Sequence, residues 1–226
     1  MNCPSCGAAM TAQTLDGHLG TEVQIDFCGG CQIFWFDHLE SLRLAPAATL
    51  GLFRMISDSA RTAPRALHEP LACPRCDLRL LLTNDRQRNT PFKYWRCGRE
   101  HGRLISFFDF LREKDFIRPL SPQQLGELRQ NLQTINCSNC GAPIDIVHSS
   151  ECAHCGTPVS MLDVKHIADV ASQTKDAGRA RAAMDALELA AIVRALKADP
   201  EVARTPPPAG LVETGLYLLG RWLTAS

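Results

Sequence analysis

The stretch from Cys3 to Cys31 decides the fold: it begins Cys3-Pro4-Ser5-Cys6-Gly7 and ends Asp26-Phe27-Cys28-Gly29-Gly30-Cys31. Its two Cys-x2-Cys pairs stand 21 residues apart. The interval contains a turn signal, Asp16-Gly17, and an alternating apolar run typical of a strand, Val23, Ile25 and Phe27. Two tight turns at neighbouring hairpin ends can place four thiolates at the corners of a tetrahedron, which is the geometry of structural zinc. The spacing therefore predicts a zinc ribbon with Cys3, Cys6, Cys28 and Cys31 as ligands.

The same pattern occurs twice more along the chain. A third Cys-x2-Cys pair is followed after 20 residues by a Cys-x3-His arrangement, and a fourth pair is followed after 11 residues by a fifth. The eleven cysteines and one histidine thus form three sets of four, with no cysteine left over. We predict three structural Zn2+ ions, the second bound by Cys73, Cys76, Cys97 and His101 and the third by Cys137, Cys140, Cys152 and Cys155.

The fourth ligand of the second set has an alternative. His101 has the Cys-x3-His spacing that zinc sites use, so we expect it to close the site. If His101 were instead an exposed loop residue, the set would hold three thiolates or would be completed by His68. A position left open would matter, because catalytic zinc works at an open coordination position. Iron in a rubredoxin-like role is the alternative metal, since it also accepts four thiolates.

The first 45 residues resemble a known family. Cys3-Pro4-x-Cys6-Gly7, Ile25-Asp26-x-Cys28-x-x-Cys31 and Trp35-Phe36-Asp37-x-x-Glu40 are similar to the transcription-factor-IIB-type zinc ribbons of small bacterial proteins. The sequence departs from that pattern at Gly29, where proline is common, and at Ile33, where glycine is common. The resemblance implies a zinc ribbon with the same four cysteine ligands, and it implies no activity.

The bulk composition favours several metal-stabilised modules over one large core. The cysteine sets fall in segments too short to bury an adequate core alone, and zinc supplies roughly 10–16 kcal/mol of apparent folding energy per site. The fold class is therefore small metal-stabilised α+β, with three tandem zinc ribbons linked by helices and an α-helical C-terminal region. The expected segments are ribbon 1 with a short capped helix (1–45), a helix and linker (46–70), ribbon 2 (71–118), a connecting helix (119–134), ribbon 3 (135–160), an alanine-rich helical region (161–198), a proline-rich linker (199–210) and an amphipathic helix (211–226).

Short-range signals predict where three of these helices begin. Asp37 and Ser121 are expected to cap helices, with Glu40 and Gln124 completing the capping boxes, and Ser160-x-x-Asp163 is expected to cap the alanine-rich helix. The carboxylates of Asp109, Glu113 and Asp115 lie on a helical segment of mixed charge, which predicts a solvated face.

The compartment follows from the thiols and from the apolar runs. The chain begins at Met1 with no basic-then-apolar leader, and no apolar run approaches the length of a membrane span. Eleven zinc-binding thiols fit a reducing compartment better than secretion with disulfides. We expect a cytoplasmic protein without a membrane span.

The second ribbon is the basic part of a chain whose formal net charge is zero. Residues 61–103 hold ten basic and four acidic side chains, interleaved with aromatic rings. A basic sheet with an aromatic face can stack bases between phosphate contacts, whereas in so small a module the rings are also needed for packing. The residues that would contact nucleic acid are Arg79, Arg88, Lys93, Tyr94, Trp95 and Arg96.

The last helix offers a different kind of partner surface. Its apolar residues gather on one side of a helical wheel, with Glu213, Tyr217 and Arg221 opposite. Such a helix docks into a groove, either on this chain or on a partner; the residues for a partner are Leu211, Leu218, Leu219 and Trp222. Since no catalytic motif is present, we expect a non-enzymatic zinc-binding adaptor that mediates protein–protein interaction within a larger intracellular assembly, the alternative being a nucleic-acid-binding accessory factor acting through ribbon 2.

Overall fold

A computed structural model of the chain describes residues 1–45, 48–49, 51–53, 55–56, 67–87, 90–172, 189–198 and 210–224. The chain divides into two compact units, Met1–Lys114 and Asp115–Ser226. This division is coarser than the eight segments expected from the sequence. A small α+β fold with mostly antiparallel sheet is confirmed.

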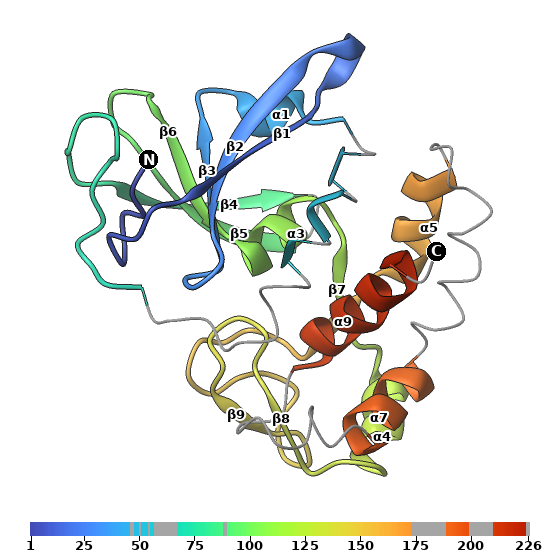
Figure 1. The fold of residues 1–226 in the computed structure, drawn as a ribbon. Coiled ribbons are helices and arrows are strands. Elements are labelled where there is room, and N and C mark those ends of the chain that lie inside the picture. The colour runs from blue at the N-terminus through green and yellow to red at the C-terminus, as the bar shows by residue number, and fades with distance from the viewer. Residues whose placement is uncertain are drawn as a thin grey trace. The chain divides into compact units, whose positions relative to one another are not determined.

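The first unit is built on one six-stranded antiparallel sheet (Figure 1). Its strands are β1 (Thr11–Asp16), β2 (Glu22–Cys28), β3 (Ile33–Asp37), β4 (Leu81–Gln87), β5 (Thr90–Arg96) and β6 (Gly102–Ser106). The strand order is β1-β2-β3-β6-β5-β4, so the third strand of each ribbon pairs with the third strand of the other. The first two cysteine sets therefore do not belong to separate tandem modules, as the sequence had suggested, but to one continuous sheet.

The two halves of this sheet repeat each other. The Cys-x2-Cys turns at Cys3 and Cys73 are offset by 70 residues, and in both the first cysteine N–H donates 2.8 Å to the carbonyl five residues later. The pairing of β3 with β6 is centred on Trp35 opposite Leu104, and the flanking pairs run outward in mirrored order. The first unit is thus a pair of ribbons with approximate twofold symmetry, whose axis passes through the centre of the sheet.

The close approach of β3 and β6 depends on a glycine. Gly102 has φ +149°, and a Cβ there would lie 2.9 Å from both Asp37 Cα and a ring carbon of Trp35, and closer still to the Phe36 carbonyl. A side chain at this position would push the two ribbons apart. Gly102 therefore permits the central strand pairing.

The helices of the first unit begin where short-range signals place them, with one difference. Glu40 accepts a hydrogen bond of 2.7 Å from the Asp37 N–H, as the predicted capping box requires. The helix itself, α1 (Glu40–Arg43), has Leu39 as its N-cap, and the Asp37 carboxylate does not cap it. That carboxylate accepts instead from Trp35 Nε1 at 2.8 Å and from Arg75 of the other ribbon at 2.6 and 3.3 Å. A residue expected to cap a helix thus joins the two ribbons.

The remaining helical elements complete the core of the first unit. A single turn of 3-10 helix, η1 (His18–Gly20), lies between β1 and β2, and α3 (Phe107–Glu113) follows β6 directly. The Ser106 hydroxyl caps α3 by accepting from the Asp109 N–H at 3.0 Å. Rings on β3 pack against rings on α3, with centroids 4.4 to 5.6 Å apart for Phe34–Phe107, Phe34–Phe110 and Phe36–Phe110. The linker residues 61–66 lie outside the described residues.

The second unit wraps helices around the third ribbon. Two short antiparallel pairs form its strands: β8 (Thr134–Asn136) with β9 (Pro143–Asp145), and β7 (Ile117–Pro119) with β10 (Ser160–Leu162). Its helices are α4 (Pro122–Arg129), α5 (Val164–Ser172), α7 (Leu189–Ala198) and α9 (Leu211–Thr224). One core joins the ribbon, α4, α7 and α9, and it includes the ligand residues Cys137 and Cys152.

The N-termini of two helices in this unit can be compared with the caps predicted from the sequence. The Ser121 capping box before α4 is confirmed: Ser121 accepts from the Gln124 N–H at 3.2 Å, and Gln124 reaches back to the Ser121 N–H at 3.2 Å. The predicted cap at Ser160 is wrong, because Ser160 lies in β10; Asp163 caps α5 instead, accepting from the His166 N–H at 3.1 Å. The linker residues 199–209 lie outside the described residues. Among the helices that the structure describes, none is long and apolar enough to cross a membrane.

Candidate metal centres

Each of the three predicted ligand sets is brought together. One ligand atom from every member lies within 4.8 Å of the others in Cys3/Cys6/Cys28/Cys31, in Cys73/Cys76/Cys97/His101 and in Cys137/Cys140/Cys152/Cys155. His101 completes the second set, whereas exposed His68 is not part of it and its backbone N–H donates to Ser5. Each set can therefore hold a metal ion with four protein ligands.

The distances within the sets fit a tetrahedral ion. Four sulfur ligands about 2.3 Å from a central zinc stand roughly 3.8 Å apart, whereas a disulfide requires about 2.05 Å. The Sγ–Sγ distances are 3.7 Å for Cys6–Cys28, 3.6 Å for Cys76–Cys97 and for Cys137–Cys155, and 3.7 Å for Cys140–Cys152. In the second set His101 Nδ1 lies 3.7 Å from Cys97 Sγ and 3.9 Å from Cys73 Sγ. The thiols thus stand at ligand spacing and not at bonding distance, and Nδ1 is the ring nitrogen that faces them.

Backbone N–H groups donate hydrogen bonds to several ligand sulfurs and so stabilise their thiolate form. The N–H groups of Cys6, Arg75 and Arg99 donate to Cys3, Cys73 and Cys97 Sγ at 3.5, 3.4 and 3.4 Å respectively. Such bonds favour the thiolate over the thiol. The Ala8 N–H does the same for Cys6 and, against the effect of burial, lowers its pKa to about 7. In the third set burial alone would raise the pKa of Cys155, but hydrogen bonds with Thr157 and with the neighbouring thiols lower it to about 6.

Other thiols in the same sets are held protonated unless a cation is present. Burial raises the pKa of Cys31 and Cys137, and raises that of Cys73 to about 11. A bound divalent cation deprotonates such ligands outright. Three or four soft sulfur donors without a water position are the donor set of structural zinc, so the residues fit the ion predicted from the sequence.

Replacing His101 separates the two candidate fourth ligands. His101→Ala is expected to reduce the metal content of the protein by one ion or more, because it removes the only nitrogen donor of the second set. His68→Ala is the matched control and should leave three ions bound, since the His68 side chain belongs to no set. The measurement is metal content per chain by native mass spectrometry. Three ions in His101→Ala and fewer in His68→Ala would assign the ligand to His68.

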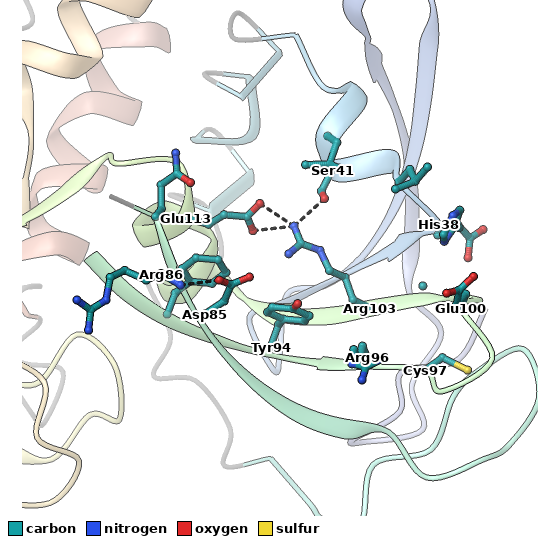
Figure 2. Close-up of a pocket in the computed structure, with 16 residues that line it drawn as sticks. His38, Ser41, Asp85, Arg86, Tyr94, Arg96, Cys97, Glu100, Arg103 and Glu113 are labelled. Atoms are coloured by element: carbon teal, nitrogen blue, oxygen red, sulfur yellow. Dashed lines mark hydrogen bonds and ion pairs between the residues drawn. The ribbon is translucent and has the colours of Figure 1, made fainter. Parts of the chain in front are cut away.

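A cavity of about 530 Å³ lies beside the second centre on one face of the sheet. That volume is in the range of ligand-binding sites. Its wall comes from β4, β5 and β6, from α1 and the segment before it, and from the end of α3. The side chains that line it include Phe92, Tyr94, Arg96, Arg103, Leu42 and Glu113. Figure 2 shows Arg103 pointing toward Glu113 and Ser41, while the side chain of Arg86 points away from them. The cavity was not foreseen from the sequence.

A largely buried ion pair lines this cavity. Arg103 Nη2 donates to both Glu113 carboxylate oxygens at 2.7 Å and to Ser41 Oγ at 2.6 Å (Figure 2). Its guanidinium also lies over the Tyr94 ring, 5.0 Å from the centroid. Lys114 Nζ donates to the Ser41 carbonyl at 2.9 Å, and burial lowers the pKa of Lys114. The sequence feature that points to one wall of this cavity is the alternation of Phe92, Tyr94 and Arg96 along β5, because alternate residues of a strand share a face.

Only some of the residues expected to contact nucleic acid are accessible in this structure. Trp95 is 7% exposed and belongs to the core that surrounds the first two centres, so it is unavailable for base stacking. Arg79 and Arg96 are exposed, Lys93 and Tyr94 are half-buried, and Arg88 lies outside the described residues. The carboxylates of α3, expected on a solvated face, are buried instead: Asp109 is 1% exposed and Glu113 8%.

Part of the helix expected to bind a partner is buried on this chain. Leu211 is 1% exposed and lies in the core of the second unit, with half-buried Leu218 packed against that core. The first half of α9 thus docks on this chain, which was one of the two alternatives, and Leu211 is not available to a partner. The side chains of Leu219 and Trp222 lie outside the described residues.

Comparison with protein-family models, with curated proteins and with solved structures finds no match. The resemblance of residues 1–45 to the transcription-factor-IIB-type ribbons stays a prediction.

Proposed function

We propose that this chain is a non-enzymatic zinc-binding adaptor, whose metal ions are structural and whose partner binds at the cavity of the first unit. All eleven cysteines belong to the three sets, so no thiol remains as a nucleophile. Each set supplies four protein ligands, which is the arrangement of a structural and not a catalytic zinc site. The metal ions build the units, and function belongs to their surfaces.

The observation that carries this proposal is a break in the symmetry of the sheet. Asp26 and Trp95 each lie opposite the central pair, Trp35 and Leu104, and so they occupy equivalent places in the two halves. Counting from them, the first half has Val23, Ile25 and Phe34 where the second half has Phe92, Tyr94 and Arg103. The first three are fully buried core residues, whereas their counterparts line the cavity.

A structural requirement does not explain that difference. A buried ion pair is often no more stable than apolar residues of similar volume, and the equivalent place in the first half is filled by a phenylalanine. Arg103 and Glu113 are therefore better explained by recognition than by stability. A protein partner fits the rest of the surface, because two exposed leucines, Leu39 (53%) and Leu42 (66%), lie beside polar groups at the cavity. Apolar residues with a polar surround are typical of protein interfaces.

The test is affinity purification with the zinc-loaded chain and two matched variants. Leu42→Asp places a charge at the cavity and is expected to lower recovery of the specific partner by about tenfold or more, since a charge in an apolar contact is strongly unfavourable. Leu19→Asp is the control, because Leu19 is fully exposed, lies in the same unit and does not line the cavity. Equal recovery by both variants would contradict the proposed surface.

A second assay tests the alternative function, nucleic-acid binding. Fluorescence anisotropy of labelled single-stranded RNA and DNA is expected to show no steeply salt-dependent binding, because the stacking residue Trp95 is buried. Micromolar binding that weakens with salt and is lost in Arg96→Ala would favour the nucleic-acid function over the adaptor.

A further inference from the structure

The C-terminal helix α9 packs directly onto the third metal centre. Leu211, Val212 and Leu216 are each 2% exposed or less. Leu211 belongs to the same core as the ligand residues Cys137 and Cys152. The apolar side of α9 is therefore covered, at Leu211 and at Leu218, by a surface that the ligands themselves help to form.

The start of α9 is fixed to the turn that carries two ligands. Glu213 accepts a hydrogen bond of 2.8 Å from the Ser138 hydroxyl, and Ser138 lies between Cys137 and Cys140. Gly210, just before the helix, is pressed against the same turn: a Cβ there would lie 2.5 Å from Ser138 Oγ and 2.9 Å from the Asn136 carbonyl, and closer still to Glu213 Oε2. Only glycine fits this contact while the turn keeps its shape.

The middle of α9 rests on a strand that leaves the other ligand turn. A Cβ at Gly215 would lie 3.1 Å from a methyl carbon of Leu162, which is in β10. That strand begins at Ser160, five residues after Cys155. Both contacts of α9 are thus made by residues that follow a metal ligand in the sequence: Ser138 follows Cys137, and Leu162 lies in the strand that follows Cys155.

Within the core that it shares with α4, α7 and α9, the third ribbon has little regular secondary structure of its own to hold it in shape. Its strands β8 and β9 are three residues each, in contrast to the six-stranded sheet that supports the first two centres. Segments of this size cannot bury enough apolar surface to stay folded without a metal or disulfides. The surface that receives α9 therefore depends on an occupied site.

We propose that metal at the third centre controls docking of α9: with the ion bound the helix is held on the second unit, and without it the helix is released with its apolar side exposed. This inference rests on the proposed zinc binding and adds a metal-dependent conformational change to it. By linkage, whatever loosens α9 must weaken metal binding at this centre by the same factor.

The experiment is hydrogen–deuterium exchange of the zinc-loaded full chain, with Cys140→Ala as the main variant. Cys140 is exposed and lies outside the core, so its replacement removes a ligand without leaving an internal hole. Backbone amides of residues 211–218 are expected to exchange at least about tenfold faster than in the wild type. Cys76→Ala, a ligand variant in the first unit, is the control and should leave that rate unchanged.

An internal reference separates release of the helix from unfolding of the unit. Helix α5 buries Ile167 and Val170, which, among the residues that the structure describes, are not part of the core that surrounds the third centre. We expect α5 to keep most of its protection in Cys140→Ala. Equal acceleration in α5 and α9, or no acceleration in α9, would overturn the proposal.

A second variant tests the coupling from the side of the helix. Gly210→Ala leaves all ligands intact and should both accelerate exchange in α9 and lower the affinity of one site in a chelator competition; Gly126→Ala, with open space around its Cβ position, is the control. Unchanged metal affinity in Gly210→Ala together with a released helix would overturn the coupling. If the wild type binds fewer than three ions, the proposed zinc function fails first, whereas three bound ions with metal-independent α9 protection would overturn the docking proposal alone.

Discussion

Replacing Cys31 with alanine is expected to release two metal ions, not one, and to unfold the whole six-stranded unit. The ligands of the first two centres share one core, in which Cys3, Cys28, Cys31, Cys73 and Cys97 pack with Trp35, Trp95 and Leu104. Since β3 and β6 join the halves at the centre of that core, neither ribbon keeps its packing when the other is lost. A structural zinc supplies roughly 10–16 kcal/mol of apparent folding energy, as much as the whole stability of a typical domain.

The measurement is native mass spectrometry, together with the near-ultraviolet circular dichroism of the buried tryptophans. Cys140→Ala is the matched control, because it removes a ligand from the second unit and should release one ion while the signal of Trp35 and Trp95 persists. A Cys31→Ala protein that keeps two ions and the aromatic signal would show that the ribbons fold independently, as the sequence alone suggests.

The metal sets were predictable because their information is local. Two ligands separated by two intervening residues lie on one tight turn, and the counting of cysteines leaves few ways to complete each set. The Ser121 capping box is local in the same way, and it stands as predicted. Such signals do not depend on how distant segments pack.

The joining of the two ribbons was not predictable, because no local signal specifies which strand pairs with β3. The pairing with β6 is set by tertiary packing around Trp35 and by the space that Gly102 leaves. Once the halves join, a strand that would be at the edge of a single ribbon becomes central. Trp95, beside that central pair, is consequently buried, and the aromatic surface expected from the sequence is lost.

The burial of charged residues on α3 was also not predicted from the sequence. Asp109 and Glu113 read as a solvated face because helices with mixed charge usually point such residues outward. In the structure α3 packs against the sheet, and each buried carboxylate has partners: Ser106 Oγ donates to Asp109 at 2.9 Å, and Arg103 donates to Glu113. Burial raises the pKa of Asp109. The partners are close in sequence, but only the fold brings them into hydrogen-bonding distance.

Replacing Glu113 with glutamine is expected to destabilise the first unit by about 3–5 kcal/mol, because it leaves the Arg103 cation buried without its counter-ion. The side chains of Arg103 and Glu113 are only 17% and 9% exposed, so solvent screens the pair little. The double variant Arg103→Met/Glu113→Leu should recover the part of that loss that is due to Arg103, since apolar residues of similar volume often replace a buried ion pair without cost. Lys114 Nζ, which lies 3.5 Å from Glu113 in the wild type, keeps its hydrogen bond to the Ser41 carbonyl. Urea unfolding of the zinc-loaded protein, followed by tryptophan fluorescence, measures both effects.

The two variants together separate stability from recognition at the cavity. If the double variant is as stable as the wild type but fails to retain the partner that Leu42→Asp also loses, the ion pair is kept for binding. If single and double variants are destabilised equally, Arg103 and Glu113 stabilise the fold directly, and the comparison with Phe34 in the other half no longer supports a binding role. The symmetry of the sheet supplies this test, because one half shows what an apolar filling of the same place looks like.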